Sequence, residues 1–222
     1  MTLSERLYAV RSAVAEAASQ AGRDPAEITT IVVTKFQPVS LIRELAALGV
    51  RDFGESRHQE ASAKAVELAD LGVRWHFVGQ LQANKAKRVR SYAQVIHSVD
   101  RDALVDALAG GEVGIDCFIQ VALNEHAGRG GVPPDALEPL TEHVCRAAGL
   151  RLRGVMAVAP LGAEPREAFA RLRKASERVR GIAPEATDIS AGMSGDFREA
   201  ILEGATHLRI GTAITGNRPP RL

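Results

Sequence analysis

The sequence predicts an α/β protein that forms one (β/α)₈ barrel of the TIM type, preceded by an extra N-terminal helix. The chain of 222 residues has the length that such a barrel typically needs, about 200 residues or more. After a leading helix, about eight strand–helix units alternate regularly, joined by the short connections usual in α/β proteins. The first strand pattern, 28–35, is apolar on both faces, which is typical of a buried parallel strand.

The individual elements follow from hydrophobic spacing and from the glycines that end most helices. The leading helix spans 4–21, with Ser4 as its expected cap and Gly22 after its end. The strand–helix pairs are 28–35 with 39–48, 50–53 with 56–70, 74–78 with 82–90, 94–97 with 101–109, 115–121 with 134–148, 152–158 with 164–181, 186–189 with 194–203, and 206–210 with a short helical tail. Because 50–53 and 186–189 are short, an open doubly wound sheet is the alternative.

Residues 1–222 are expected to form a single domain, because no linker or low-complexity tract interrupts the pattern. A net charge of +1 gives no field that favours nucleic acid or an acidic membrane. No signal peptide or membrane-length apolar run is visible, so we expect a cytoplasmic protein. We also expect a monomer. Cys117 and Cys145 are expected to be buried and reduced, and the histidines form no metal-ligand motif.

The functional hypothesis starts from Lys35, which ends the first strand pattern three residues before Pro38. In a parallel barrel the carboxyl ends of the strands form the mouth where ligands bind. An amine beside apolar walls is partly neutral and can condense with an aldehyde. A lysine that merely marks the strand end and reaches water is the alternative.

The last two strand–helix loops have the chemistry of a phosphate cradle. The loop 190–197 contains Gly192 and Ser194, and the loop after strand 206–210 contains Gly211 and Thr212. Glycine turns and hydroxyls at this place in a (β/α)₈ barrel often bind phosphate. Barrel closure would bring both loops next to the first strand. Arg209 ends the last strand and is the cation best placed to face the mouth, with a rim salt bridge as the alternative.

One connection, 122–133, is long, glycine-rich and polar. Loops of this length in compact domains are often functional or mobile. We expect a flexible lid, with simple surface disorder as the alternative. The Gly-x-Gly spacing is not a dinucleotide fingerprint, since the glycines do not sit between a strand and a helix of one unit.

Several motifs together resemble the pyridoxal 5′-phosphate (PLP) homeostasis proteins, the YggS/PROSC family. The resemblance covers nearly the whole chain in the family's order, and its most specific parts are the tryptophan-to-lysine and the closing arginine-glycine-threonine segments. The motifs are Val33-Thr34-Lys35, Phe53-Gly54-Glu55-Ser56, Trp75 to Lys85, Ser98-Val99-Asp100-Arg101, Leu152 to Met156, Ser190 to Ser194, and Arg209 to Ile214.

The resemblance implies a barrel similar to the N-terminal domain of bacterial alanine racemase that carries PLP as an imine. Lys35 matches the Schiff-base lysine, and Arg209 matches the arginine that faces the pyridine nitrogen. The matching phosphate-binding positions are Ser194, Gly211 and Thr212, with help from the backbone near Gly192 and Met193. Ser56 and, less directly, Asn84 are expected at the cofactor.

The sequence departs from the family pattern in three places. Ser56-Arg57 stands where asparagine-tyrosine is usual, so a shorter hydroxyl replaces an amide near the cofactor ring. Gln80 stands where proline is common. The segment 127–130 lacks the lysine of a lysine-serine-glycine pattern, which puts a second lysine site for the cofactor in doubt.

Three functions are compatible with these residues. The favoured one is a non-catalytic protein that binds PLP on Lys35, supports PLP and amino-acid/keto-acid homeostasis, and passes the cofactor to PLP-dependent apoenzymes. The second is a PLP-dependent racemase or related enzyme with Lys35 as one base and His76 or Tyr92 as the other, although a lone histidine in an apolar strand is more often a hydrogen-bonded core residue. The third is a phosphate-binding barrel isomerase without an aldehyde cofactor.

Overall fold

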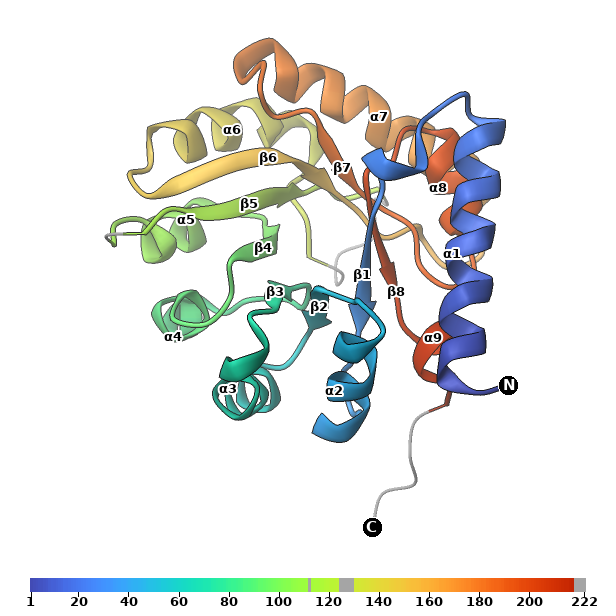
Figure 1. Ribbon diagram of the computed structural model, residues 1–222. Helices are drawn as coiled ribbons and strands as arrows, with labels where there is room; N and C mark the ends of the chain where they lie inside the picture. The colour runs from blue at the N-terminus through green and yellow to red at the C-terminus, as the bar shows by residue number, and fades with distance from the viewer. Residues whose placement is uncertain (112, 124–129, 218–222) are drawn as a thin grey trace.

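The computed structural model confirms the predicted (β/α)₈ barrel (Figure 1). The structure describes residues 1–111, 113–123 and 130–217. Parallel strands follow one another around a closed barrel in chain order, and the last strand pairs with the first. They are β1 (Thr29–Val33), β2 (Asp52–Glu55), β3 (Arg74–Phe77), β4 (Val95–Val99), β5 (Ile115–Gln120), β6 (Leu150–Met156), β7 (Asp188–Ser190) and β8 (His207–Ile210). Their carboxyl ends therefore meet at one mouth.

Helices surround the barrel and connect consecutive strands (Figure 1). The α-helices after the strands are α2 (Val39–Ala47), α3 (His58–Glu67), α4 (Ala86–Arg90), α5 (Asp102–Leu108), α6 (Leu137–Arg146), α7 (Pro165–Ile182), α8 (Phe197–Leu202) and α9 (Thr212–Thr215). Short 3₁₀ turns are η1 (Pro25–Glu27), η2 (Ala69–Leu71), η3 (Ala83–Lys85) and η4 (Pro134–Ala136). Three of the long helices expected from the sequence, at 56–70, 82–90 and 134–148, thus each divide into an α-helix and a 3₁₀ turn.

The leading helix α1 (Leu3–Gln20) lies along α8 and α9, beside the last strand–helix units (Figure 1). Its apolar face is buried, and Arg6 Nε donates to the carbonyl oxygen of Ile214 at 2.7 Å. The cap is Thr2 rather than the expected Ser4. Thr2 and Glu5 form a reciprocal capping box, in which Glu5 N donates to Thr2 Oγ1 and Thr2 N donates to Glu5 Oε2.

Two kinds of core stabilise the barrel. The larger core lies between strands and helices and contains fully buried side chains such as Phe53, Leu104 and Ile119. Inside the barrel, by contrast, a small apolar cluster of Val95, Phe118 and Met156 packs beside polar side chains. The interior of this barrel is therefore partly polar, and each polar group there needs a hydrogen-bond partner.

The strand boundaries differ from the predicted ones at two short strands, at Lys35 and at β6, which spans Leu150–Met156 instead of residues 152–158. β2 begins at Asp52 rather than at residue 50, and β7 begins at Asp188 rather than at residue 186. β1 ends at Val33 because the chain turns there. Gln37 N donates to the Thr34 carbonyl oxygen at 3.0 Å, and Phe36 has a positive φ of 65°. Lys35 therefore lies in a tight turn after the strand instead of at its last position.

The two cysteines differ in exposure. Cys117 is buried and free, as expected, whereas Cys145 is free but exposed, because it lies on the outer face of α6. Among the described residues, no group of three or more histidine, cysteine, aspartate or glutamate side chains is placed to hold a metal ion. Within that same part of the chain, every helix is too short or too polar to cross a membrane.

Candidate functional site

A cleft of about 390 Å³ at the mouth of the barrel brings together residues from both ends of the chain. β1 and β8 are neighbours, with Val32 paired to Ile210, so the turn that holds Lys35 lies next to the loops after β7 and β8. We call this space the β1–β8 cleft. Its described lining is Val33, Lys35, Ser56, Val78, Val158, Met193, Ser194, Gly195, Arg209, Gly211 and Thr212. Most of the residues that the sequence selected as a site therefore meet here.

The loops after β7 and β8 form one continuous wall of the β1–β8 cleft. Ala213 N donates to Ser194 Oγ at 3.3 Å, which ties the two loops together. Gly192 has φ +90°, and a Cβ on it would lie 2.8 Å from Ala200 Cβ, so only glycine fits this turn. The wall presents the hydroxyls of Ser194 and Thr212 beside glycine-containing turns, and hydroxyls can donate to a phosphate, whereas Met193 N already donates to Asp196 Oδ1 at 2.6 Å.

Lys35, on the β1 side of the cleft, is exposed, so the apolar enclosure expected from the sequence is not found. The backbone on either side of Lys35, however, is held by hydrogen bonds to two side chains of α3. Lys64 Nζ donates to the carbonyl oxygen of Thr34 at 2.7 Å, and Phe36 N donates to Glu60 Oε1 at 2.5 Å. The positive φ of Phe36 is strained for a residue other than glycine, and the bond to Glu60 helps to hold it. The turn thus positions Lys35 while its amine stays accessible.

The group that holds this turn is a buried ion cluster behind β1. Lys64 is 5% exposed, and its Nζ contacts Glu55 Oε1 at 2.7 Å and Glu60 Oε1 at 2.6 Å. Thr34 Oγ1 also donates to Glu55 Oε1, at 2.8 Å. Burial raises the pKa of Glu55, although Lys64 opposes that shift, and Glu55 Oε2 has no hydrogen-bond partner among the described residues. Removing Lys64 would leave two carboxylates without their cation, which is strongly destabilising.

Arg209 reaches the β1–β8 cleft from the barrel interior and is 5% exposed. Its Nη1 donates to Ser190 Oγ at 2.7 Å, and its Nη2 donates to the carbonyl oxygen of Ala157 at 2.8 Å. Burial lowers the pKa of Arg209 to about 10, so the guanidinium remains charged at neutral pH. Since a guanidinium has five N–H donors, others remain to bind a ligand atom in the cleft.

Arg209 begins a chain of hydrogen bonds that runs down the barrel interior. Ser190 Oγ lies 2.8 Å from His97 Nδ1, His97 Nε2 lies 3.0 Å from His76 Nδ1, and His76 Nε2 lies 2.9 Å from Asp52 Oδ1. Asp52 begins β2 and is partly exposed at the opposite end of the barrel. Five residues on five strands thus link the mouth to the far end.

The chemistry of its two ends fixes the direction of this chain. A guanidinium can only donate and a carboxylate can only accept. We therefore assign each bond in one direction, with Ser190 donating to His97, His97 to His76 and His76 to Asp52. Every group then has a matched partner with both imidazoles neutral.

The charge states agree with that assignment. Burial lowers the pKa of His76, and burial holds the pKa of His97 well below its usual value, so both rings are neutral at pH 7. Burial has the largest single influence on the pKa of Asp52 and would raise it, but the hydrogen bond from His76 and the nearby basic side chains together outweigh burial, and the pKa is lowered. The chain therefore joins a buried cation to an ionised carboxylate through neutral groups.

The remaining sequence candidates fall into two groups. Ser56 and Met193 line the β1–β8 cleft, whereas Asn84 is exposed on η3 and is not among the described lining residues. His76 is the hydrogen-bonded core residue that the sequence favoured. Tyr92 lies outside the barrel, where its hydroxyl is 3.4 Å from His58 Nδ1.

The lid expected at 122–133 falls largely on residues 124–129, which lie outside the described residues. The described ends of the loop are joined to each other. Ala122 N donates to the Val132 carbonyl oxygen at 3.0 Å, and Val132 N donates to that of Gln120 at 2.7 Å. Gly131 N also donates to Asp100 Oδ2 at 3.2 Å. These bonds fix where the loop leaves and re-enters the barrel mouth.

Comparisons with known proteins agree with the resemblance seen in the sequence. Residues 7–219 match the family model of the alanine racemase N-terminal domain. A pyridoxal phosphate homeostasis protein of Mycobacterium bovis is 41% identical, over 97% of this chain and 93% of that protein. A solved structure of PipY from Synechococcus elongatus with PLP bound is 35% identical, with a TM-score of 0.85, over 97% of this chain and all (100%) of that one. Alanine racemase from Corynebacterium glutamicum, at 18% identity and a TM-score of 0.70, covers 96% of this chain and 62% of its own, and shares the fold.

Proposed function

Because the chain belongs to the family of pyridoxal phosphate homeostasis proteins, built on the alanine racemase N-terminal domain, we propose that it binds PLP in the β1–β8 cleft. The cofactor is held as an imine on Lys35 and is stored or delivered rather than used for turnover. The cellular role is the homeostasis of PLP and of the amino acids and keto acids that depend on it. PLP-dependent apoenzymes in the cytoplasm are the proposed recipients, and the protein acts as a monomer.

The observation that carries this proposal is the meeting of three chemistries in one cleft of ligand size. Lys35 provides an accessible amine for the aldehyde, and the wall of Ser194, Gly195, Gly211 and Thr212 provides donors for the phosphate. Arg209 provides a buried cation for the ring. Ser56 and Met193 complete the lining, and Asn84 remains a more distant candidate contact. The residues present therefore fit PLP.

Arg209 also supports binding without efficient catalysis. When bound, PLP supplies an electron sink whose strength depends on the protonation of its ring nitrogen. A charged Arg209 would donate a hydrogen bond to that nitrogen and would leave it unprotonated, and the hydrogen-bond chain to Asp52 keeps Arg209 in place. With Arg209 in this position, bound PLP would be a weak electron sink.

The lining of the β1–β8 cleft has few groups for proton transfer. Lys35 and Arg209 are the ionisable side chains among its described residues. Racemisation needs a second acid–base group on the other face of the substrate carbon. His76 is committed to the interior hydrogen-bond chain, and Tyr92 lies against His58 outside the barrel.

The test combines a binding readout with a turnover readout. Purified protein loaded with PLP should show the visible absorption band of an imine, and Lys35→Ala should lose it while Lys85→Ala, on η3, keeps it. The loaded protein should exchange the Cα proton of alanine no faster than free PLP does. Fast exchange would replace the carrier with a racemase-type enzyme, and absence of the band at saturating PLP would refute the imine.

A further inference from the structure

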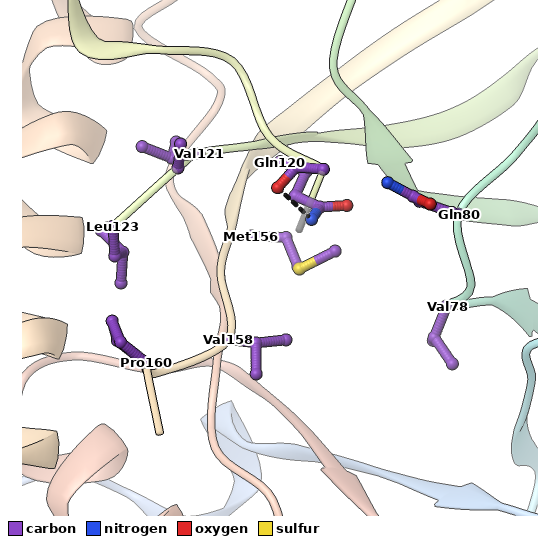
Figure 2. Close-up of a pocket in the computed structure, with 10 residues that line it drawn as sticks. Val78, Gln80, Gln120, Val121, Leu123, Met156, Val158 and Pro160 are labelled. Atoms are coloured by element: carbon purple, nitrogen blue, oxygen red, sulfur yellow. Dashed lines mark hydrogen bonds between the residues drawn. The ribbon is translucent and has the colours of Figure 1, made fainter. Parts of the chain in front are cut away.

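A second cavity, of about 350 Å³, lies beside the β1–β8 cleft on the side of β3, β5 and β6 (Figure 2). The two spaces share Val78 and Val158 as lining residues. In Figure 2 the side chains of Met156, Val158 and Val78 surround the same space, with Gln80 and Gln120 at its upper edge. A ligand in this side cavity would therefore lie next to whatever Lys35 holds.

The chemistry of the side cavity selects an uncharged group. Its described lining is largely aliphatic, with the carboxamides of Gln80 and Gln120 as the polar side chains and no ionisable one. Gln120 Nε2 already donates to the carbonyl oxygen of Gly130 at 2.9 Å. Among the described lining residues a charged group would find no counter-ion in return for its lost hydration, whereas an aliphatic group gains apolar contacts. The volume is at the lower end of small-ligand sites.

We infer that the side cavity is a subsite for the uncharged side chain of a small primary amine, the class that includes neutral amino acids. This inference rests on the proposed function, because an aldehyde held by Lys35 forms the same bond with another amine. In that exchange the aldehyde carbon forms a C–N bond to the incoming amine and breaks its C–N bond to Lys35. The two hydrogens of the incoming amine end on Lys35, and no oxidant is needed. Such amines would thereby free the cofactor from Lys35.

The two internal methionines provide separate reporters for the two spaces. Met156 lies in the side cavity and Met193 lines the β1–β8 cleft. Protein labelled with ¹³C at the methionine methyl groups can be titrated with PLP, with isobutylamine and with β-alanine, which carries a carboxylate in place of the branched alkyl group. PLP should shift the Met193 signal. Isobutylamine should shift the Met156 signal with and without PLP, and β-alanine should not.

A tryptophan that fills the side cavity tests the subsite, and a tryptophan outside the cavity is the matched control. Gln80 is exposed and lines the side cavity, whereas Gln82 is exposed two residues later and is not among the described lining residues. Gln80→Trp should weaken the Met156 response to isobutylamine at least about tenfold, since one indole occupies much of a cavity this size, and Gln82→Trp should not.

The outcomes separate the two hypotheses. A Met193 signal that ignores PLP would overturn the proposed function and the subsite with it. A normal Met193 response, combined with a Met156 signal that ignores isobutylamine or follows β-alanine equally, would overturn the subsite alone. An equal loss of response in both tryptophan variants would do the same.

Discussion

Two lysines near the carboxyl end of β1 differ in almost every physical respect. Lys35 is exposed on the wall of the β1–β8 cleft, while Lys64 is 5% exposed behind the same turn and has three oxygen partners. The buried amine has its donors occupied and supports the backbone. The exposed amine is the one that can react. In this protein, burial marks the structural lysine, and the accessible amine on a rigid turn is the one that we propose to react.

The largest expected effect comes from removing the buried lysine. Lys64→Met leaves Glu55 and Glu60 without their cation, and should lower the free energy of unfolding by about 3–5 kcal/mol. Lys35→Met should change it by less than about 0.5 kcal/mol, because the side chain is exposed. Urea unfolding of both variants measures the difference.

A double variant tests the cause of that loss. Lys64→Met combined with Glu55→Leu removes both charges and should recover part of the stability. Equal stability of Lys64→Met and Lys35→Met would contradict the claim that the buried lysine stabilises the fold and the exposed one does not.

Changes in the loops after β7 and β8 should affect the affinity for PLP rather than the stability of the fold. Ser194→Ala or Thr212→Val removes one hydroxyl from the expected phosphate site, and each should weaken PLP binding by about 10- to 100-fold, because a hydrogen bond to a charged group contributes about 1.5–3 kcal/mol. The unfolding free energy should hardly change. Thr187→Val, an exposed control before β7, should bind PLP normally. Equilibrium titration of each variant with PLP, followed by absorbance, measures the affinity. Unchanged affinity in both cleft variants would show that the phosphate does not bind at Ser194 and Thr212.

The stability of the protein should depend on pH through His207, a half-buried residue that begins β8 and whose ring lies beside His97 and Phe118 in the barrel interior. Burial lowers the pKa of His207 to about 4, whereas an unfolded histidine has a pKa of about 6.5. Between these values the unfolded chain binds a proton that the folded chain does not, so stability falls as the pH drops below about 6.5. This single group should account for about 2 kcal/mol of loss between pH 6.5 and pH 5.

Replacing His207 isolates that contribution. His207→Gln should flatten the dependence of the unfolding free energy on pH over that range by the stated amount. An identical pH slope in the wild type and in His207→Gln would show that folding does not lower the pKa of His207.

The smallest effect concerns the turn itself. Glu60→Gln keeps an acceptor for Phe36 N but removes a charge that Lys64 contacts, and should destabilise the fold by about 1 kcal/mol. Imine formation on Lys35 should become slower or weaker in proportion, since the turn is less rigid. If Glu60→Gln left PLP binding unchanged while lowering stability, the ion cluster would support the fold but not the position of Lys35.

The fold could be predicted from the sequence because alternating strands and helices, ended by glycines, repeat along the whole chain. The strand boundaries were less accurate than the order of the elements, with shifts of two residues at β2, β6 and β7. β7 has three residues, too few for a hydrophobic period to locate its start. At β1 the apolar pattern ran on to Lys35, but the turn at Phe36 follows from contacts with Glu60, which lies 24 residues later.

The cleft was predictable because barrel closure brings the first and last units together. The interior hydrogen-bond chain was not, because its members lie on separate strands and each looks like an isolated polar residue. A usable signal was present: His76, His97, Ser190 and Arg209 all interrupt otherwise apolar strands. Lys64 gave no such signal, since a lysine four residues after Glu60 on a helix resembles a solvent-exposed pair.

The central claim is that Lys35, and not the buried Lys64, bonds to PLP. Borohydride reduction of the PLP-loaded protein, followed by peptide mass mapping, tests it most directly. The account predicts one pyridoxyl group on the peptide that contains Lys35 and none on the peptide that contains Lys64. A label at Lys64 or at another lysine, or no label under conditions where PLP remains bound, would contradict it.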